Sequence, residues 1–318
     1  MWKRRDVIFT LKSPLHIGYL PFKGSVISPT RYYIPGKNFW GAITKRATES
    51  FPSSGDYKKI GLEIKDSFRF SYFYLYDGKA IFIPKYKDSG LVFGEDGKEQ
   101  IDKFSFERRF IGSRVLTAID SKSGTARDES LHEIEFVKHR FRDEKGNIEN
   151  TRIIGSIWIK EGSYLNDFKI KFDNNGIFVN DFNLIEELVL GGEQGYGFGK
   201  VHLEKVLNEK RFPIGKSNNT QSNEIEIKIE SVSPILSHLK YEQNISFQGD
   251  IELLIGRGYF DIEKSDSKAS EYKKDAGNVI TNKGYYFSPG TMIERDDEFL
   301  LDWDGIIRKE VDDRNETN

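Results

Sequence analysis

The sequence predicts an α+β fold: a ferredoxin-like βαββαβ core with insertions, followed by a C-terminal β-rich segment. Three observations predict it: segments with the period-two alternation of strands, two segments with apolar residues at helical spacing, and the order of these segments along the chain. The first strand is expected at 6–12 (DVIFTLK). A helix is expected over about 39–50, with Asn38 as its N-cap and with Phe39, Ile43 and Ala47 on one face.

The remaining core elements follow in the order that the fold requires. Strands are expected at 68–76 and 80–84, joined through Asp77-Gly78, a hairpin turn signal. Two more are expected at 131–137 and 153–160. A second helix is expected over 180–190, where Leu184, Ile185 and Leu188 would form an apolar stripe, and the last strand at 201–206.

Composition shifts suggest where the chain divides. Residues 207–223 have the polar, Asn-rich composition of a linker. We therefore expect one domain over 1–206, with a mid-chain insertion at about 85–150. Residues 224–318 begin with the alternating EIEIKIESV and are expected to form a β-rich or degenerate ferredoxin-like module.

Composition also excludes several classes of protein. The chain has 318 residues, 37% of them hydrophobic, and this is enough for a sizeable core. It has no cysteine, which excludes disulfides, thiolate metal sites and cysteine nucleophiles. No apolar run approaches a membrane span and the N-terminus lacks a signal-peptide core, so a cytoplasmic protein is expected.

Charge is distributed unevenly although the net charge is only -2. Residues 1–46 hold nine Lys and Arg against Asp6 alone, and residues 103–127 hold six against two acids. Residues 294–318 hold ten acids and four bases. Basic stretches in a near-neutral chain are typical of a defined polyanion groove, although ordinary solvated faces could also produce them.

A glycine-rich segment, GGEQGYGFGK at 191–200, precedes the expected last strand. Glycine permits positive φ and close backbone approach, so such a loop can contact phosphates, with Lys200 adding charge and Tyr196 or Phe198 offering surfaces for stacking. Nucleotide-binding glycine loops connect a strand to a following helix, whereas a strand follows Lys200. Nucleotide binding of that kind is therefore not expected, and a tight connector without a ligand is the alternative.

Three segments together resemble the RAMP superfamily of CRISPR-associated proteins. LGGEQGYGFGKV at 190–201 is similar to the family's Gly-rich loop between the last helix and the last strand. IPGKNFWGA at 34–42, preceded by PLHIG at 14–18, resembles the motif that opens the first helix. LTAIDSKSGTARDESLHEIEF at 116–136 resembles the mid-chain TGTA-containing segment, with Ser123 where the first Thr is common. These segments cover roughly residues 1–206.

The resemblance implies a guide-RNA (crRNA)-binding subunit of a type III-like CRISPR complex, with target RNA and other subunits as partners and no cofactor. It implies RNA backbone contacts from the Gly-rich loop and the first helix, and a thumb-like mid-chain hairpin that packs between bases of the guide–target duplex. The residues carried over, with basic residues chosen because phosphates need them, are Lys37, Lys45, Arg46, Arg108, Arg109, Arg114, Lys122, Arg127, Gly192, Gly195, Gly197, Gly199 and Lys200.

Two alternatives stay open at this stage. One is a RAMP endoribonuclease that cuts target or precursor RNA. Slicing members use an aspartate in the loop after the first strand, but residues 18–33 contain no acid, and this leaves Asp120 as a candidate. His16 is the candidate for metal-independent cleavage. The other alternative is a protein-interaction scaffold that does not touch RNA. The five histidines have no metal-site spacing, and no metal site is expected.

Overall fold

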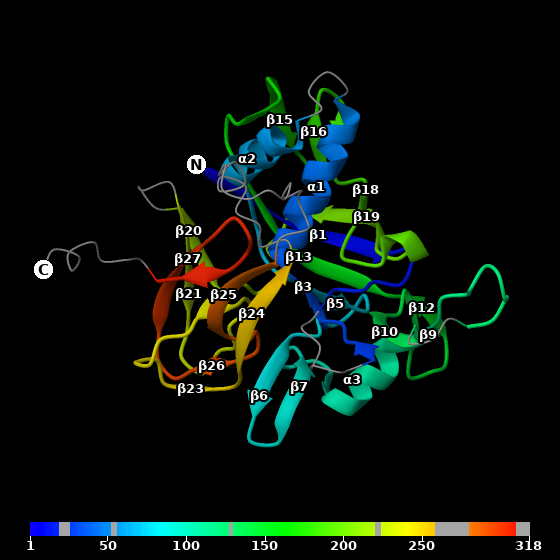
Figure 1. Cartoon of the computed structure of the whole chain (residues 1–318). Coiled ribbons are helices and arrows are strands. Elements are labelled where there is room, and N and C mark those ends of the chain that lie inside the picture. Colours follow the sequence, from blue (N-terminus) through cyan, green and yellow to red (C-terminus); the bar gives the residue numbers. More distant parts are fainter. Residues whose placement is uncertain (19–25, 52–55, 127–129, 220–223, 258–279, 310–318) are drawn as a thin grey trace, which may run out of the picture.

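The computed structural model describes residues 1–18, 26–51, 56–126, 130–219, 224–257 and 280–309 (Figure 1). These residues form a strand-rich α+β fold with three α-helices and one short 3-10 helix. The predicted class, α+β, is confirmed. None of the helices in these ranges is long and apolar enough to cross a membrane.

A seven-stranded sheet forms the centre of the molecule. Its strands follow the order β18-β19-β1-β13-β5-β3, and β4 also pairs with β13. Strand β1 lies between β13 and β19 and is antiparallel to both. The bounds are β1 (Trp2–Leu11), β3 (Tyr33–Ile34), β4 (Phe68–Phe70), β5 (Phe73–Tyr76), β13 (Arg152–Lys160), β18 (Glu187–Val189) and β19 (Lys200–Leu207). The strands expected at 6–12, 153–160 and 201–206 are confirmed.

Helices cover one face of this sheet. Helix α1 (Gly36–Ser50) buries Phe39, Ile43 and Ala47, as predicted, and Phe39 stacks on Phe73 with ring centroids 3.9 Å apart. Its N-cap is Pro35 rather than Asn38, since the Asn38 backbone N–H already bonds the Pro35 carbonyl. Helix α2 (Tyr57–Ser67) begins after Asp56, whose carboxylate caps it.

A second seven-stranded sheet covers the other face, in the order β20-β21-β27-β28-β22-β25-β24. Ile8 and Trp158 of the central sheet pack with Ile227 and Phe299 of this sheet in one apolar cluster. Both faces of the central sheet are therefore buried. The bounds are β20 (Lys216–Asn219), β21 (Ile225–Ile229), β22 (Leu239–Lys240), β24 (Ile251–Arg257), β25 (Ile280–Phe287), β27 (Asp297–Leu301) and β28 (Ile307–Arg308).

Smaller elements surround the two sheets. One three-stranded sheet has the order β2-β10-β9 and another the order β6-β7-β8, next to helix α3. The bounds are β2 (Ile27–Ser28), β6 (Pro84–Lys87), β7 (Gly90–Gly94), β8 (Gln100–Asp102), α3 (Lys103–Phe110), β9 (Ile111–Leu116), β10 (His132–Val137), β11 (Arg140–Arg142), β12 (Ile148–Asn150), β14 (Tyr164–Leu165), β15 (Phe168–Phe172), β16 (Ile177–Val179), β17 (Phe182–Asn183), β23 (Phe247–Gln248) and β26 (Met292–Ile293).

The second helix predicted over 180–190 is wrong. The short strands β17 and β18 occupy this segment, and β14–β17 form a four-stranded sheet before the Gly-rich loop. Leu184, Ile185 and Leu188 are buried as the helical spacing required. However, Asn180 and Asp181 both adopt positive φ and turn the chain into a hairpin. The Gly-rich loop consequently connects two strands, not a helix and a strand.

Other local predictions also need correction. The strand expected at 68–76 is divided into β4 and β5, because one extra residue lies on it between the pairs Phe70–Ile157 and Tyr74–Ile154, and the Ser156 N–H there donates to the Ser71 side chain. Residues 80–83 form no strand and hold only an isolated bridge, Tyr76 with Ile81. Helices α2 and α3 were not predicted. The strand expected at 131–137 is confirmed as β10.

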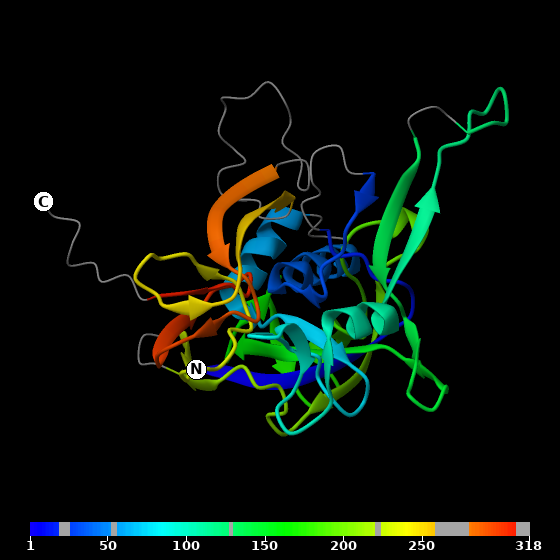
Figure 2. The same cartoon turned by 90° about the horizontal axis from the view of Figure 1, so that it is seen from below.

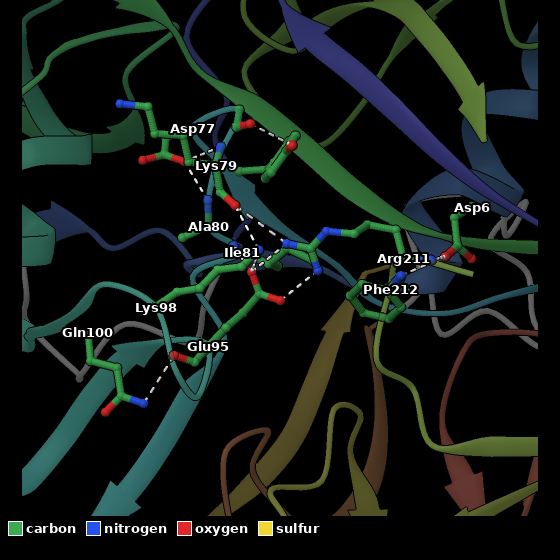
Figure 3. Close-up of polar contacts among 12 residues, drawn as sticks. Asp6, Asp77, Lys79, Ala80, Ile81, Glu95, Lys98, Gln100, Arg211 and Phe212 are labelled. Carbon is green, nitrogen blue, oxygen red and sulfur yellow. Dashed lines mark hydrogen bonds and ion pairs between the residues drawn. The ribbon is translucent and has the colours of Figure 1, made fainter. Parts of the chain in front are cut away.

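The segment after β19 is bonded to the first half of the chain. The buried Asp6 carboxylate accepts hydrogen bonds from the Arg4 and Ser156 side chains and from the backbone N–H groups of Arg211 and Phe212, the latter at 2.6 Å. The Arg211 guanidinium in turn binds both oxygens of Glu95 at 2.6 Å (Figure 3). The first part of the 207–223 segment is thus held in place by charged groups.

A second buried network connects the two large sheets. Arg31 binds both carboxylate oxygens of Glu252 at 2.9 and 3.0 Å, and Glu252 also contacts His238. The Tyr72 hydroxyl lies 2.6 Å from the other nitrogen of His238. Burial lowers the pKa of His238. The contacts that Glu252 makes with His238 and Arg31 lower the pKa of Glu252 to about 2. A neutral imidazole that donates to Glu252 and accepts from Tyr72 satisfies all three groups.

Candidate nucleic-acid interface

The Gly-rich loop, residues 190–200, is anchored at both ends by the segment after β1. The Gly192 N–H donates to the His16 carbonyl at 2.9 Å and the Gly199 N–H to the Pro14 carbonyl at 2.7 Å. A Cβ on Gly191 would lie 2.2 Å from the His16 carbonyl oxygen, and one on Gly199 would lie 2.1 Å from that of Leu190. Both glycines also have positive φ, so close packing and backbone conformation explain them.

The apex of the loop differs from its ends. It is a 3-10 turn, Gln194–Tyr196, flanked by Glu193 and Gly197 in the left-handed conformation. A Cβ added to Gly195 or Gly197 would meet nothing within 4 Å. The Tyr196 side chain is 55% exposed. The apex therefore presents bare backbone and an open aromatic ring to solvent.

Two predicted cations flank this apex. Lys45 of α1 reaches the Gln194 side chain at 3.5 Å, which brings the first helix and the loop together as the sequence motifs implied. Lys200 is exposed at the start of β19. Within the residues that the structure describes, neither lysine forms an ion pair, whereas Glu193 is the one acid of the loop.

The loop also contacts the base of the mid-chain hairpin. Phe198 is buried, with its ring edge-on to Phe136 of β10 at 5.4 Å. Arg114 of β9 lies over the Phe198 ring at 5.7 Å and is exposed. Phe198 is therefore a packing residue, which leaves Tyr196 as the ring of the loop that is free to stack on a base.

The hairpin of β9 and β10 projects from the body of the molecule (Figure 2). Lys122 and Asp120 lie near its tip, and both are exposed. Val115, Ile119 and Leu131 are apolar side chains exposed on it, at 61%, 71% and 62%. Arg127 lies outside the described residues.

Two candidates at the first helix have contacts within the protein. Arg46 donates to the Asn183 carbonyl at 3.3 Å and lies over the Phe182 ring. Lys37 is half-buried, and its N–H bonds the Asp304 carbonyl at 3.0 Å. A Cβ on Gly36 would lie 2.8 Å from that same carbonyl. The IPG motif at the start of this helix therefore packs against the backbone of Asp304, near the C-terminal end of the described residues.

Arg108 and Arg109 are adjacent in α3, but their environments differ. Arg109 forms ion pairs with Asp77 and Glu99 at 3.2 and 2.7 Å and lies over three phenylalanine rings. Arg108 is exposed, and its side chain forms no ion pair within the described residues. The charge of Arg109 is compensated internally, whereas that of Arg108 is available to a ligand.

The two catalytic candidates each have a structural contact. His16 is 4% exposed, and its Nδ1 lies 2.7 Å from the Glu135 carbonyl. Asp120 accepts hydrogen bonds from the backbone N–H groups of Lys122 and Ser123, and these bonds lower the pKa of its carboxyl group. Among the described residues, no three His, Asp or Glu side chains cluster as a metal site would require.

Three cations that sequence reasoning missed lie close to Arg108. Lys138, Arg140 and Arg142 line one cleft with it, between α3 and the β11–β12 hairpin. The signal for them was present in KHRFR at 138–142, where basic residues alternate while Phe141 is buried.

Comparison with known proteins gives a structural relationship without a sequence relationship. No family model matches the chain, and no curated protein matches it in sequence. The chain is similar to a chain of the cryo-EM structure of the type III-B Cmr-beta bound to cognate target RNA, with 12% identity and a TM-score of 0.50. The match covers 92% of this chain and 86% of that chain.

The match extends to a second state. With the Cmr-beta complex bound to cognate target RNA and AMPPnP, the identity is 11%, the TM-score 0.51 and the coverage again 92% and 86%. The likeness establishes the fold. At this identity it says nothing about individual side chains.

Proposed function

We propose that this chain is a guide-RNA-binding structural subunit of a type III-like CRISPR ribonucleoprotein complex, and a member of the RAMP superfamily. The observation that carries the proposal is the open apex of the Gly-rich loop. Gly195 and the exposed ring of Tyr196 follow Gln194, which Lys45 contacts, and the exposed Lys200 ends the loop. Bare backbone, an open ring and uncompensated cations together suit a single-stranded RNA backbone and its bases.

The geometry divides the glycines into two groups. The N–H groups of Gly192, Gly197 and Gly199 already donate within the protein, so they do not form a phosphate cradle of free donors. Gly195 has open space where a side chain would be, so RNA can approach the backbone there. We therefore infer that Gly192 and Gly199 shape the loop, while Gly195 and Lys200 make the contact.

The arrangement of strands supports a ferredoxin-like core. The order β19-β1-β13-β5 is the order of the four strands in a ferredoxin-like sheet, with α1 and α2 after the first strand. In this interpretation the β14–β17 sheet takes the place of the second helix. The similar fold in a Cmr-beta complex bound to target RNA is consistent with the same role.

The hairpin and the rest of the chain complete the proposal. We infer that the projecting β9–β10 hairpin, with Arg114 and Lys122, contacts the guide or its target, and that other subunits of the complex bind this chain. The division at 207–223 into a domain 1–206 and a module 224–318, and a cytoplasmic location, stay predictions. His16 and Asp120 have the structural contacts given above, and among the described residues no arrangement around them favours the endonuclease alternative.

Electrophoretic binding of the purified chain to guide RNA containing the CRISPR repeat, and to unrelated RNA, tests the proposal over a salt series. We expect binding that salt weakens steeply, without strand cleavage. Lys200→Ala should weaken binding by about fivefold to tenfold. The slope of log affinity against log salt concentration should fall by the amount expected for one phosphate contact. Gly195→Ala should also weaken binding while the thermal unfolding curve stays unchanged.

Lys205→Ala is the matched control, because Lys205 is an exposed lysine farther along the same strand. It should bind RNA as the unaltered chain does. Absence of RNA binding, also after the other subunits of a type III complex are added, would contradict the proposal and leave the scaffold alternative. Specific cleavage would favour the endonuclease.

A further inference from the structure

The cleft beside α3 has an excess of cations that the Gly-rich loop does not explain. It has a volume of about 710 Å³, and its charged lining consists of Arg108, Arg109, Lys138, Arg140, Arg142, Glu99, Asp143 and Glu144. In Figure 1, α3, β9, β10 and β12 gather at this corner of the molecule. Five cations thus face three acids.

Two of the three acids of the lining already have partners within the protein. Glu99 pairs with Arg109 at 2.7 Å, so these two charges of the lining compensate each other. Asp143 accepts hydrogen bonds from the N–H groups of Lys145 and Asn147 and closes the turn between β11 and β12. Glu144 is exposed and forms no ion pair within the described residues.

The cations, by contrast, keep free donors. Arg108 and Arg140 are exposed and have no acidic partner in the described part of the chain. Arg142 gives one N–H to the Gly146 carbonyl at 3.1 Å. Lys138 gives one to the Arg108 carbonyl at 2.9 Å, and its ammonium retains two others.

Local packing fixes Lys138 beside the hairpin base. Its backbone N–H bonds the Phe110 carbonyl at 2.7 Å. A Cβ on Gly112 would lie 3.4 Å from the Lys138 side chain and 2.9 Å from the Phe136 ring, so the glycine makes room for both. Partial burial disfavours the charged ammonium of Lys138 and lowers its pKa. A bound anion would offset this loss of hydration.

The cleft and the Gly-rich loop are both next to the hairpin. Phe136 packs against Phe198 of the loop, and Lys138, two residues on, lines the cleft. An RNA strand that passes the base of the hairpin can therefore reach cations in both places. Convergent guanidinium and ammonium groups with few competing acids are suited to phosphate.

We propose that this cleft binds phosphate groups of the RNA, through Arg108, Lys138, Arg140 and Arg142, as a second contact apart from the Gly-rich loop. The inference depends on the proposed function, because it requires that the chain binds RNA at all. It adds a site that the sequence motifs do not include.

The test compares two double charge reversals in the full chain. Arg108→Glu with Arg140→Glu changes the cleft, and Lys169→Glu with Lys171→Glu changes two exposed lysines of β15, at the opposite end of the molecule in Figure 1. Both alter the net charge equally. Binding of fluorescent single-stranded guide RNA is measured by anisotropy over a salt series.

The cleft variant should lose about tenfold or more in affinity, and its salt slope should fall by about 1.4, the value for two single-strand phosphate contacts. The β15 variant should change neither quantity by a comparable amount. Equal losses in the two variants would show a general charge effect and overturn the inference.

The remaining outcomes separate this inference from the proposed function. RNA binding that depends on Lys200 but not on the cleft would overturn the cleft contact alone. No RNA binding by the unaltered chain would overturn both. Calorimetric titration with inorganic phosphate is a further arm: phosphate binding that the cleft variant loses, with RNA binding intact, would assign the cleft to a small phosphate ligand instead.

Discussion

Two regions of this molecule both hold arginines or lysines but arrange their charges in opposite ways. Where the segment after β19 meets the central sheet, cations and acids are paired. Arg211 pairs with Glu95 (Figure 3). Arg109 pairs with Asp77 and Glu99. Around the Gly-rich loop and the hairpin, Arg108, Arg114 and Lys200 form no ion pairs within the described residues.

The difference suggests which charges serve the fold and which serve a ligand. A buried charge has lost its hydration, so it must be compensated by the protein itself. An exposed cation without an acidic partner keeps its donors for an anion. The same residue type therefore contributes to stability in one region and, in our proposal, to RNA binding in the other.

The largest effect should come from Asp6. Its buried carboxylate accepts four hydrogen bonds, so Asp6→Ala should leave the Arg4 Nε–H, the Ser156 hydroxyl and two backbone N–H groups without this acceptor. We expect a loss of about 3–5 kcal/mol in the free energy of unfolding, measured by urea denaturation. Asp120→Ala, at an exposed turn, is the control and should change the midpoint little. Equal effects of the two changes would contradict the distinction between the regions.

The two adjacent arginines of α3 test the comparison most directly. Arg109→Ala leaves Asp77 and Glu99 without their partner and should cost about 2–4 kcal/mol in unfolding free energy. Arg108→Ala should cost less than about 0.5 kcal/mol but weaken RNA binding. Urea denaturation and RNA anisotropy are both measured on each variant. An Arg108 variant that loses stability without losing RNA affinity would show that both arginines are structural.

The fold could be predicted from the sequence only in part. Alternation of apolar residues was enough for β1, β13 and β19, because these strands are buried and their pattern is local. It was not enough for 180–190, where buried residues had helical spacing but two positive-φ residues turned the chain. The spacing of apolar residues in the sequence indicates which of them are buried. Contacts with other parts of the chain decide whether a helix or a strand buries them.

The candidate site shows the same limit. Motifs led to the Gly-rich loop and Lys45, which the structure brings together. They could not separate Arg108 from Arg109, since Asp77 lies more than thirty residues from Arg109 in sequence. They also missed the role of Gly36, which accommodates Asp304 from the end of the chain. Both depend on long-range contacts that a single sequence does not display.

A smaller effect should separate two glycines of the loop. Gly199 has a φ of 87° and a Cβ there would meet the Leu190 carbonyl, so Gly199→Ala should cost about 1–3 kcal/mol in unfolding free energy. Gly195→Ala should leave stability unchanged, because its Cβ would lie in open space. Thermal unfolding monitored by circular dichroism measures both. If Gly195→Ala is the more destabilising of the two, the apex is not the open surface that our proposal requires.

The smallest effect concerns acid sensitivity, which the paired charges should confer. The pKa of Glu252 falls to about 2 from 4.5, so its contribution is complete above pH 4.5 and is lost as the pH falls toward 2. The depressed pKa of His238 acts in the same direction from about pH 6.5 downward, because the unfolded state takes up its proton first. Urea midpoints between pH 7 and pH 4 should therefore fall, with Glu252 contributing on the order of 1 kcal/mol at pH 4. Glu252→Gln should flatten this dependence, whereas Glu298→Gln, an exposed control, should retain it. If the Glu252 variant keeps the full pH dependence, the acid sensitivity arises from groups other than the buried network of Glu252 and His238.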